Sequence, residues 1–487
     1  MKDENNEEGI LQGDVSDVRI NAASARPTEI PKEEELKNKD KPKTKIQLTP
    51  YRFIIVIVYF FLNFINGMHW VTFASCAAKF GKFYHLNTFL VDLFSLLFMI
   101  LYPICCIPEA YIIDNISMRI GLTISALLLI IGSFLKIFIN NSIIFAYIGQ
   151  FLTAVFQPAI LNSPGKIAAT WYNEKSRTLI TSICCVSNTI GIMVGYLIHG
   201  FVIEENIVNP RMFRDAFEKY LLVEFIITTI LCLIFIFLMK NKPKYPPSLS
   251  KDNYQPTSLK DGIKQLKSNI NFIKLLISLT CIVGFINIFG TIFNSYMALY
   301  KISDKTATYT AASANLFGIL TALVVGIIID KYKKYKYSMI ICNIISLIIF
   351  TITTMLMETV KKKDIGLTSF ICYTLIIGSA VPIYTSGMDY VCEITYPVGE
   401  SISEGIIMCF NQIMGIVGIV ICDSFRTYLK TYKFLTNVFC IILFMISLIS
   451  LIFVDSKLVR TGEDIKQRKE EISDEKKEFL IEEEKDN

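Results

Sequence analysis

Long apolar segments alternate with short polar ones over most of this chain. A helix needs about 20 apolar residues to cross a bilayer, and twelve segments meet this criterion. The apolar residues run continuously instead of alternating at every second position, so they favour helices over the strands of a membrane barrel. We therefore predict an all-α, polytopic membrane protein. The segments cover residues 53–75, 88–113, 120–139, 143–163, 178–203, 220–239, 271–299, 308–329, 337–357, 366–390, 400–425 and 435–454.

Polar stretches divide the chain into five predicted parts. Two six-helix halves are separated by a long polar linker, within which residues 258–268 have the spacing of a short amphipathic helix. Both ends of the chain are rich in Lys and Glu, and the N-terminal end is poor in aromatic residues, which is typical of disorder. The predicted parts are a disordered cytoplasmic tail (1–50), the N-terminal half (51–239), a cytoplasmic linker (240–270), the C-terminal half (271–456) and a charged cytoplasmic tail (457–487).

Composition narrows the class of protein. The chain is 53% hydrophobic and 19% charged, whereas soluble proteins carry about 25% charged residues. A net charge of +5 is too small to predict a nucleic-acid surface. These values argue against a soluble enzyme, a disordered scaffold and a nucleic-acid binder. We expect the lipid bilayer and a small-molecule substrate as partners of a monomer.

No motif for catalysis or for metal binding is apparent. The chain has 13 cysteines without a CxxC pair, and its histidines, His69, His85 and His199, are too scattered for a metal site. There is no P-loop and no GxSxG motif, so ATP-driven pumping and hydrolysis have no sequence support. We predict no cofactor, no metal and no enzymatic activity. Transport down a gradient or coupled to one is the remaining class.

Lys and Arg residues predict the orientation in the membrane. They precede the first span, fill the linker and occupy the loop after the eighth span, and all of these positions lie on one side of a twelve-span protein. Residues 361–363 and 426–433 add basic charge on the opposite side. The larger excess predicts that both termini are cytoplasmic, in a multi-pass protein of the plasma membrane or of an internal organelle.

The two halves repeat one short motif. Asp114 follows the second span and Asp330 follows the eighth, each four residues after a small residue and shortly before basic residues. An Asp at a helix end can contact positive charge and the N-terminus of a neighbouring helix. We predict a cytoplasmic gate made of Asp114 with Arg119 and of Asp330 with Lys331. Two ordinary solvated helix ends are the alternative.

Uncharged polar residues recur within the predicted spans. Polar groups in lipid are costly, so their positions are informative. They are arranged as the lining of a central site would be, although interhelical hydrogen bonding is the alternative for any one amide. Trp70 either anchors a span at the membrane surface or presents a π-face to an organic cation. The candidate substrate-binding residues are Trp70, Gln157, Gln412, Asn66, Asn188 and Asn287.

Acidic residues in or beside the spans are few. They include Asp92, Glu109, Glu224, Asp389, Glu393 and Asp423. No carboxylate–His or carboxylate–Arg relay is apparent in the middle of a span, which favours a facilitative carrier over a proton-coupled one.

Several segments resemble the FLVCR family of the major facilitator superfamily, a family of heme and choline transporter relatives. The likeness covers about residues 51–456. Six spans, a polar linker and six more spans are also the layout of this superfamily. The segments are 66–70, 83–84, 157–168 with Trp171, 188–191, and 393–397 followed by Glu400, Gly405 and 412–415, together with Asp92, Asp114 and Arg119.

The resemblance implies a central pocket of aromatic and amide side chains that binds choline or ethanolamine. The pocket Trp of the family matches Trp70, and its amides match Gln157 and Gln412. A family Tyr on the seventh span has no counterpart, because Asn287 stands there with Phe285 and Phe289 nearby. We expect a transporter that moves a choline- or ethanolamine-like solute by alternating access. The alternatives are a carrier of heme, a vitamin or an amino acid, and a non-transporting receptor on the same fold.

Overall fold

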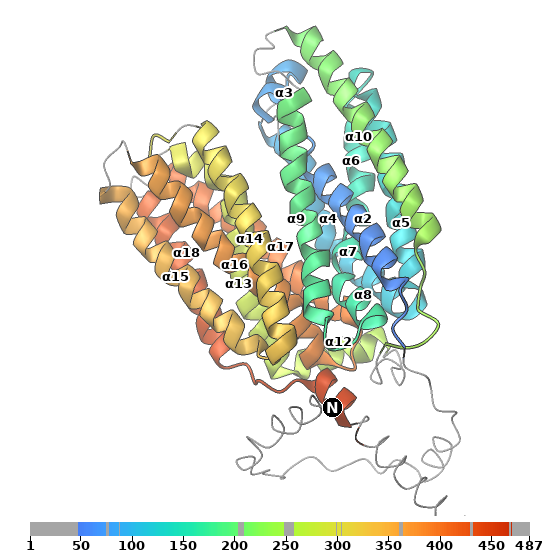
Figure 1. The fold of residues 1–487 in the computed structure, drawn as a ribbon. Coiled ribbons are helices and arrows are strands. Elements are labelled where there is room, and N and C mark those ends of the chain that lie inside the picture. Colours follow the sequence, from blue (N-terminus) through green and yellow to red (C-terminus); the bar gives the residue numbers. More distant parts are fainter. Residues whose placement is uncertain are drawn as a thin grey trace, which may run out of the picture. The chain divides into compact units, whose positions relative to one another are not determined.

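The computed structural model contains long helices that lie roughly side by side (Figure 1). It describes residues 47–74, 77–86, 88–202, 209–247, 258–298, 300–302, 304–359, 364–428, 432–466 and 469. Within these residues, twelve helices are long and apolar enough to cross a membrane, which confirms the predicted all-α membrane class. Residues 1–46 of the predicted disordered tail and most of the predicted C-terminal tail lie outside the described residues.

The N-terminal half contains the first six membrane-crossing segments, and two of them are interrupted. A π-helix follows α4, and Pro158 near the start of α7 separates that helix from α6, as its ring predicts. Two short helices, α3 and α8, were not predicted. The elements are α2 (Arg52–Val71), α3 (Ala77–Tyr84), α4 (Thr88–Tyr111), η3 (Ile112–Ile116), α5 (Met118–Ile137), η4 (Phe138–Asn140), α6 (Ile143–Val155), α7 (Gln157–Leu161), α8 (Pro164–Trp171), α9 (Arg177–Val202) and α10 (Pro210–Leu238).

The C-terminal half begins after the linker helix, which forms where its amphipathic pattern predicts. Ser258 caps this helix by accepting a hydrogen bond from the Asp261 backbone N–H. The described elements are α12 (Leu259–Ser268), α13 (Ile270–Ala298), α14 (Asp304–Tyr332), α15 (Tyr335–Thr359), α16 (Ile365–Thr395), α17 (Glu400–Tyr428) and α18 (Tyr432–Ile452).

Helix α10 begins ten residues earlier than the predicted span. Its first turns carry Arg214 and Glu218 among aromatic residues, and these charges hid the helix from a search for apolar runs. Phe213 and Phe217 are buried against Phe73 and other aromatic rings. The aromatic packing therefore extends the sixth span beyond its apolar part.

Helices α2 and α9 lie in close contact through glycine. A Cβ at Gly191 would overlap the backbone carbonyl of Phe64, and a Cβ at Gly67 would overlap that of Asn188. The lack of side chains at both positions allows the two backbones to approach each other, as small residues do in membrane helices. This contact fixes the side chains of α2 relative to those of α9.

The substitution Gly191→Ala should destabilise the protein by about 1–3 kcal/mol, because the backbone of α2 must move away. Thermal unfolding of the purified protein in detergent measures the loss. Gly290→Ala on α13 is the matched control, since nothing lies within 4 Å of a Cβ there. Equal unfolding midpoints for the two variants would contradict the close contact of α2 with α9.

The two halves approach each other toward the end that carries α12 (Figure 1). We call this the linker end, and we call the contact between the halves there the seam. Its elements are α8, η3 and the first turns of α9 from the N-terminal half, and the ends of α14 and α16 with the start of α17 from the C-terminal half. Most polar contacts recorded between the halves lie in this region.

Candidate functional site

The structure brings three predicted amides together in the N-terminal half. The Gln157 side-chain N–H lies 3.4 Å from Asn66 Oδ1, and the Asn188 side-chain N–H lies 3.3 Å from the same oxygen. Asn66 belongs to α2, Asn188 to α9, and Gln157 begins α7 at the helix break. Helices α7 and α9 therefore each direct an amide N–H group at one side-chain oxygen of α2.

Three polar atoms of this cluster and its neighbour Trp70 have no hydrogen-bond partner within the described residues. Asn66 Nδ2, Gln157 Oε1 and Trp70 Nε1 are buried without a hydrogen-bond partner within the described part of the chain. Trp70 lies one turn after Asn66 on α2, and its side chain is half-buried. Buried polar atoms are nearly always satisfied in folded proteins. A polar solute bound here would form hydrogen bonds with these two donors and this acceptor.

Asn188 also has a packing function. Its Nδ2 lies 3.2 Å from the backbone oxygen and 3.1 Å from the side-chain oxygen of Asn63, and Asn63 donates to the Cys184 carbonyl at 2.9 Å. These bonds join α2 to α9 beside the glycine contact. The alternative role of an interhelical hydrogen bond thus applies to Asn188 in this conformation.

The candidates of the C-terminal half lie on α13 and α17. A Cβ at Gly415 would lie 3.2 Å from the Cβ of Asn287 and 2.9 Å from Met99 Cε, so α4, α13 and α17 meet at this level. Gln412 precedes Gly415 by almost one turn and is half-buried, as is Asn287. The described contacts do not join either amide to Asn66 or Gln157.

A buried charged cluster lies next to Trp70 and corrects the sequence interpretation. Lys136 Nζ lies 2.8 Å from His69 Nδ1 and 3.8 Å from Glu224 Oε2, and the Thr72 hydroxyl donates to Glu224 Oε1 at 2.6 Å. The sequence showed no carboxylate–His relay because each of α2, α5 and α10 supplies one member of the cluster. The groups are fully buried or nearly so, and together they hold α2 in place.

At the seam, Asp114 contacts the C-terminal half. Its carboxylate accepts hydrogen bonds from the backbone N–H groups of Ser401 (3.3 Å) and Ile402 (3.0 Å) at the start of α17. Lys166 Nζ lies 3.1 Å from Asp114 Oδ1 and 3.3 Å from Glu400 Oε2. The helix dipole of α17 and the Lys166 ammonium both stabilise the carboxylate.

The predicted contact of Asp114 with Arg119 is not observed, because Arg119 faces a different neighbour. Its backbone N–H bonds to the Asn241 side chain at 3.3 Å, and its guanidinium lies 3.5 Å from the Ile236 carbonyl at the end of α10. The chain turns at Ser117, which caps α5, and this turn directs Arg119 away from the seam. Lys166 was missed, although a lysine in the Pro-Gly start of a buried helix is an unusual residue that could have marked it.

Asp330 repeats the arrangement on the other side of the seam. It accepts hydrogen bonds from the backbone N–H groups of Thr178 (3.0 Å) and Leu179 (2.8 Å) at the start of α9. Its ion pair is with Lys333, at 3.4 Å, instead of the predicted Lys331. Lys331 lies over the ring of Tyr332, 5.4 Å from its centroid. Lys333 follows the end of α14 in a left-handed conformation (φ 54°), and its side chain reaches back to Asp330.

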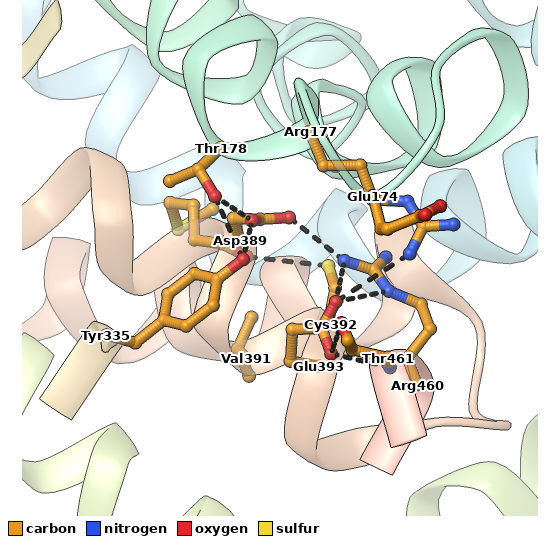
Figure 2. Close-up of polar contacts among 12 residues, drawn as sticks. Glu174, Arg177, Thr178, Tyr335, Asp389, Val391, Cys392, Glu393, Arg460 and Thr461 are labelled. Carbon is orange, nitrogen blue, oxygen red and sulfur yellow. Dashed lines mark hydrogen bonds and ion pairs between the residues drawn. The ribbon is translucent and has the colours of Figure 1, made fainter. Parts of the chain in front are cut away.

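A larger polar network connects both halves to the C-terminal segment (Figure 2). Arg460 lies 3.0 Å from Asp389 and 2.9 Å from Glu393, two acids one turn apart on α16. Arg177 at the start of α9 lies 3.7 Å from Glu393 and 3.3 Å from Asp464. Residues 459–466 are helical. This short segment after the last span therefore binds the start of α9 and the end of α16 together.

Arg460 is the positive charge between the two carboxylates of Asp389 and Glu393 in this network. Burial alone would lower the pKa of its guanidinium, but the carboxylates of Glu393 and Asp389 raise that pKa well above its ordinary value. The Thr178 hydroxyl donates to Asp389 at 2.8 Å, and the Tyr335 hydroxyl donates at 2.6 Å. Each acid is thus paired and hydrogen-bonded, as buried charges must be. The sequence identified Asp389 and Glu393 but gave no partner for them.

Comparison with protein-family models identifies the fold. The model of the Major Facilitator Superfamily matches residues 55–419, which is most of the chain. The chain belongs to the major facilitator superfamily. It is thus a multi-pass membrane transporter, and the predicted twelve-helix major facilitator fold is confirmed.

Curated members of the superfamily confirm the resemblance to the FLVCR family. The chain is 25% identical over 398 residues to the choline/ethanolamine transporter FLVCR1 of Felis catus, covering 80% of this chain and 70% of that protein. It is 27% identical over 385 residues to the choline/ethanolamine transporter FLVCR2 of Homo sapiens, covering 76% and 71%.

Among solved structures, the chain resembles a major facilitator superfamily transporter named FucP, crystallised in the outward conformation. The TM-score is 0.66 at 13% sequence identity, over 83% of this chain and 99% of FucP. At this identity the likeness concerns the fold alone.

Proposed function

We propose that this transporter carries a choline- or ethanolamine-like solute by alternating access, and that transport is facilitative. In this proposal the cluster of His69, Lys136 and Glu224 joins α2, α5 and α10 and does not relay protons. The single observation that carries the proposal is the group of unsatisfied polar atoms on Asn66, Gln157 and Trp70. An indole face attracts an organic cation, and the amides can bind a hydroxyl group of the same solute. The relatives named as choline/ethanolamine transporters support this substrate class.

The site in this proposal spans both halves. Trp70 contacts the cationic end of the solute, while Gln157 and Gln412 act as polar walls from opposite halves. Asn66, Asn188 and Asn287 complete the lining. The halves rock around this site, and the seam is the contact that must break when the linker end opens. In this proposal, residues 51–239 and residues 271–456 are the two halves that move relative to each other.

The linker end faces the cytoplasm in this proposal. Lys240, Lys267 and Lys333 lie at or near this end, in agreement with the excess of positive charge on cytoplasmic loops. The chain therefore begins and ends in the cytoplasm. The described conformation is closed toward that side.

Uptake of radiolabelled choline and ethanolamine in cells that lack endogenous carriers tests the proposal. Saturable uptake of either solute, competed by the other, is the expected result. Competition by heme, a vitamin or an amino acid instead would change the substrate class. No flux of any of these solutes into vesicles containing the purified protein would favour a receptor.

The substitution Trp70→Ala should abolish most choline uptake without reducing the amount of protein in the membrane. A desolvated cation–π contact is worth about 2 kcal/mol, which corresponds to about a thirtyfold loss of affinity. Trp70→Phe keeps an aromatic face and should retain part of the uptake. Phe61→Ala, on the exposed side of the same helix, is the control that should behave as the unmodified protein. Unchanged uptake in Trp70→Ala would remove Trp70 from the site.

A further inference from the structure

Glu404 is a buried carboxyl group that crosses the seam. It lies on α17 in the C-terminal half, and its side chain is fully buried. Its Oε1 accepts a hydrogen bond from the backbone N–H of Gly165, 2.9 Å away at the start of α8 in the N-terminal half, and lies 3.8 Å from the Cys392 thiol. Its Oε2 has no hydrogen-bond partner among the described residues. One oxygen of this carboxyl group is therefore unsatisfied.

No cation pairs with Glu404 among the ion pairs of the described residues. Lys166, the residue after Gly165, lies between the carboxylates of Asp114 and Glu400. Arg460 lies between Asp389 and Glu393. Both cations thus already serve two carboxylates each, and an ionised Glu404 would add a third negative charge around Lys166.

The other titratable groups around Glu404 do not offer positive charge either. They come from four neighbouring elements and from its own helix, and they are acids, thiols and phenols. In the described part of the chain they are Tyr59 on α2, Asp114 on η3, Cys184 and Cys185 on α9, Tyr384, Asp389 and Cys392 on α16, and Glu400 on α17.

These contacts favour the neutral form of Glu404 in this conformation. The Gly165 N–H and the start of α8 favour a negative charge, but a helix N-terminus carries only about half of an elementary charge. Against it stand the loss of hydration of a full charge, the neighbouring carboxylates and an oxygen without a donor. A protonated carboxyl group removes the full charge and keeps the hydrogen bond from Gly165.

We propose that Glu404 is a proton-binding site whose occupancy is coupled to closure of the linker end. The carboxylate binds one proton from water when the halves close, and the carboxylic acid releases that proton to water when they separate. Because both steps exchange the proton with the same compartment, solute transport stays facilitative while the conformational equilibrium depends on pH. This inference rests on the alternating access of the proposed function.

The sign of the pH effect follows from proton linkage. The closed form binds one more proton than the open form, so acid favours closure of the linker end. In the range where a solvated carboxyl group is ionised and the buried one is neutral, the closed-to-open ratio falls up to tenfold for each rise of one pH unit. Glu404→Gln mimics the neutral acid and should keep the linker end closed at every pH.

Hydrogen–deuterium exchange of the purified, full-length protein tests the proposal in the absence of solute, so it is independent of the transport assay. Peptides covering residues 164–171 and 400–409 contain backbone N–H groups that cross the seam. After correction for intrinsic rates, their protection should fall between about pH 5 and pH 8. In Glu404→Gln, the protection should be high and independent of pH.

Glu109→Gln is the matched control. Glu109 is also buried, and it accepts one backbone N–H bond from Ala159 at 2.8 Å, but both residues belong to the N-terminal half. This variant should keep the pH response of the unmodified protein. If Glu404→Gln does not fold, Glu404→Asp keeps a carboxyl group at this position. The infrared band of the protonated carboxyl group, which absorbs apart from a carboxylate, should then shift in Glu404→Asp and stay in place in the other variants.

Two results would overturn the proposal. One is protection that does not change with pH in the unmodified protein, and the other is the same pH response in Glu404→Gln. If that variant also loses choline binding, Glu404 is a substrate ligand. Absence of choline transport with an intact pH response would contradict only the proposed function.

Discussion

Replacing Arg460 by alanine should destabilise the protein by about 3–5 kcal/mol, the usual result of removing one member of a buried ion pair. The guanidinium is 2% exposed and lies between Asp389 and Glu393. Without it, two carboxylates stay buried one turn apart on the same helix. Arg177, which lies 3.7 Å from Glu393, compensates only in part.

Thermal unfolding of the purified protein in detergent measures this effect. Lys457→Ala is the matched control, because Lys457 precedes Arg460 by three residues and its side chain is exposed. It should leave the midpoint unchanged. If both variants unfold at the same temperature, the short helical segment at 459–466 does not stabilise the described conformation.

The second large effect is expected at the seam. Asp114→Ala removes the acceptor of two backbone N–H groups at the start of α17 and one of the two carboxylates around Lys166. A hydrogen bond to a charged group contributes about 1.5–3 kcal/mol. The closed linker end should therefore lose about tenfold to a hundredfold of its population relative to the open form.

Hydrogen exchange of residues 400–409 detects this shift as lower protection at constant pH. Asp261→Ala removes an exposed acid that accepts a hydrogen bond from Ser258 in its own helix cap, and it should have no effect on residues 400–409. Protection in Asp114→Ala equal to that of the control would show that the Asp114 contacts do not hold the seam.

The sequence predicted the helices well because membrane spans follow from length and hydropathy alone. Helix α15 (Tyr335–Thr359) extends only two residues beyond the predicted span at each end. The errors arose where charge interrupts the pattern, as in the first turns of α10. The short helix α8 is too brief and too small in side chains to resemble a span.

The contact partners were harder to predict. Asp114 and Asp330 lie beside basic charge, but this charge belongs to Lys166 and Lys333 and not to the predicted sequence neighbours Arg119 and Lys331. A helix start from the other half supplies the main donors to each Asp, and its position depends on how the halves pack. The same limit hid the cluster of His69, Lys136 and Glu224, since three distant helices form it.

The donors to Asp114 and Asp330 are backbone N–H groups, so the side chains of the donor residues can change in evolution without loss of these hydrogen bonds. Thr178, Leu179, Ser401 and Ile402 donate through atoms that every residue except proline has. Substitution of Leu179 or Ile402 by any residue other than proline therefore keeps the hydrogen bond to Asp330 or Asp114. The positions that must be retained are mainly the two acceptors, Asp114 and Asp330, so relatives with few identical residues can keep the same closure.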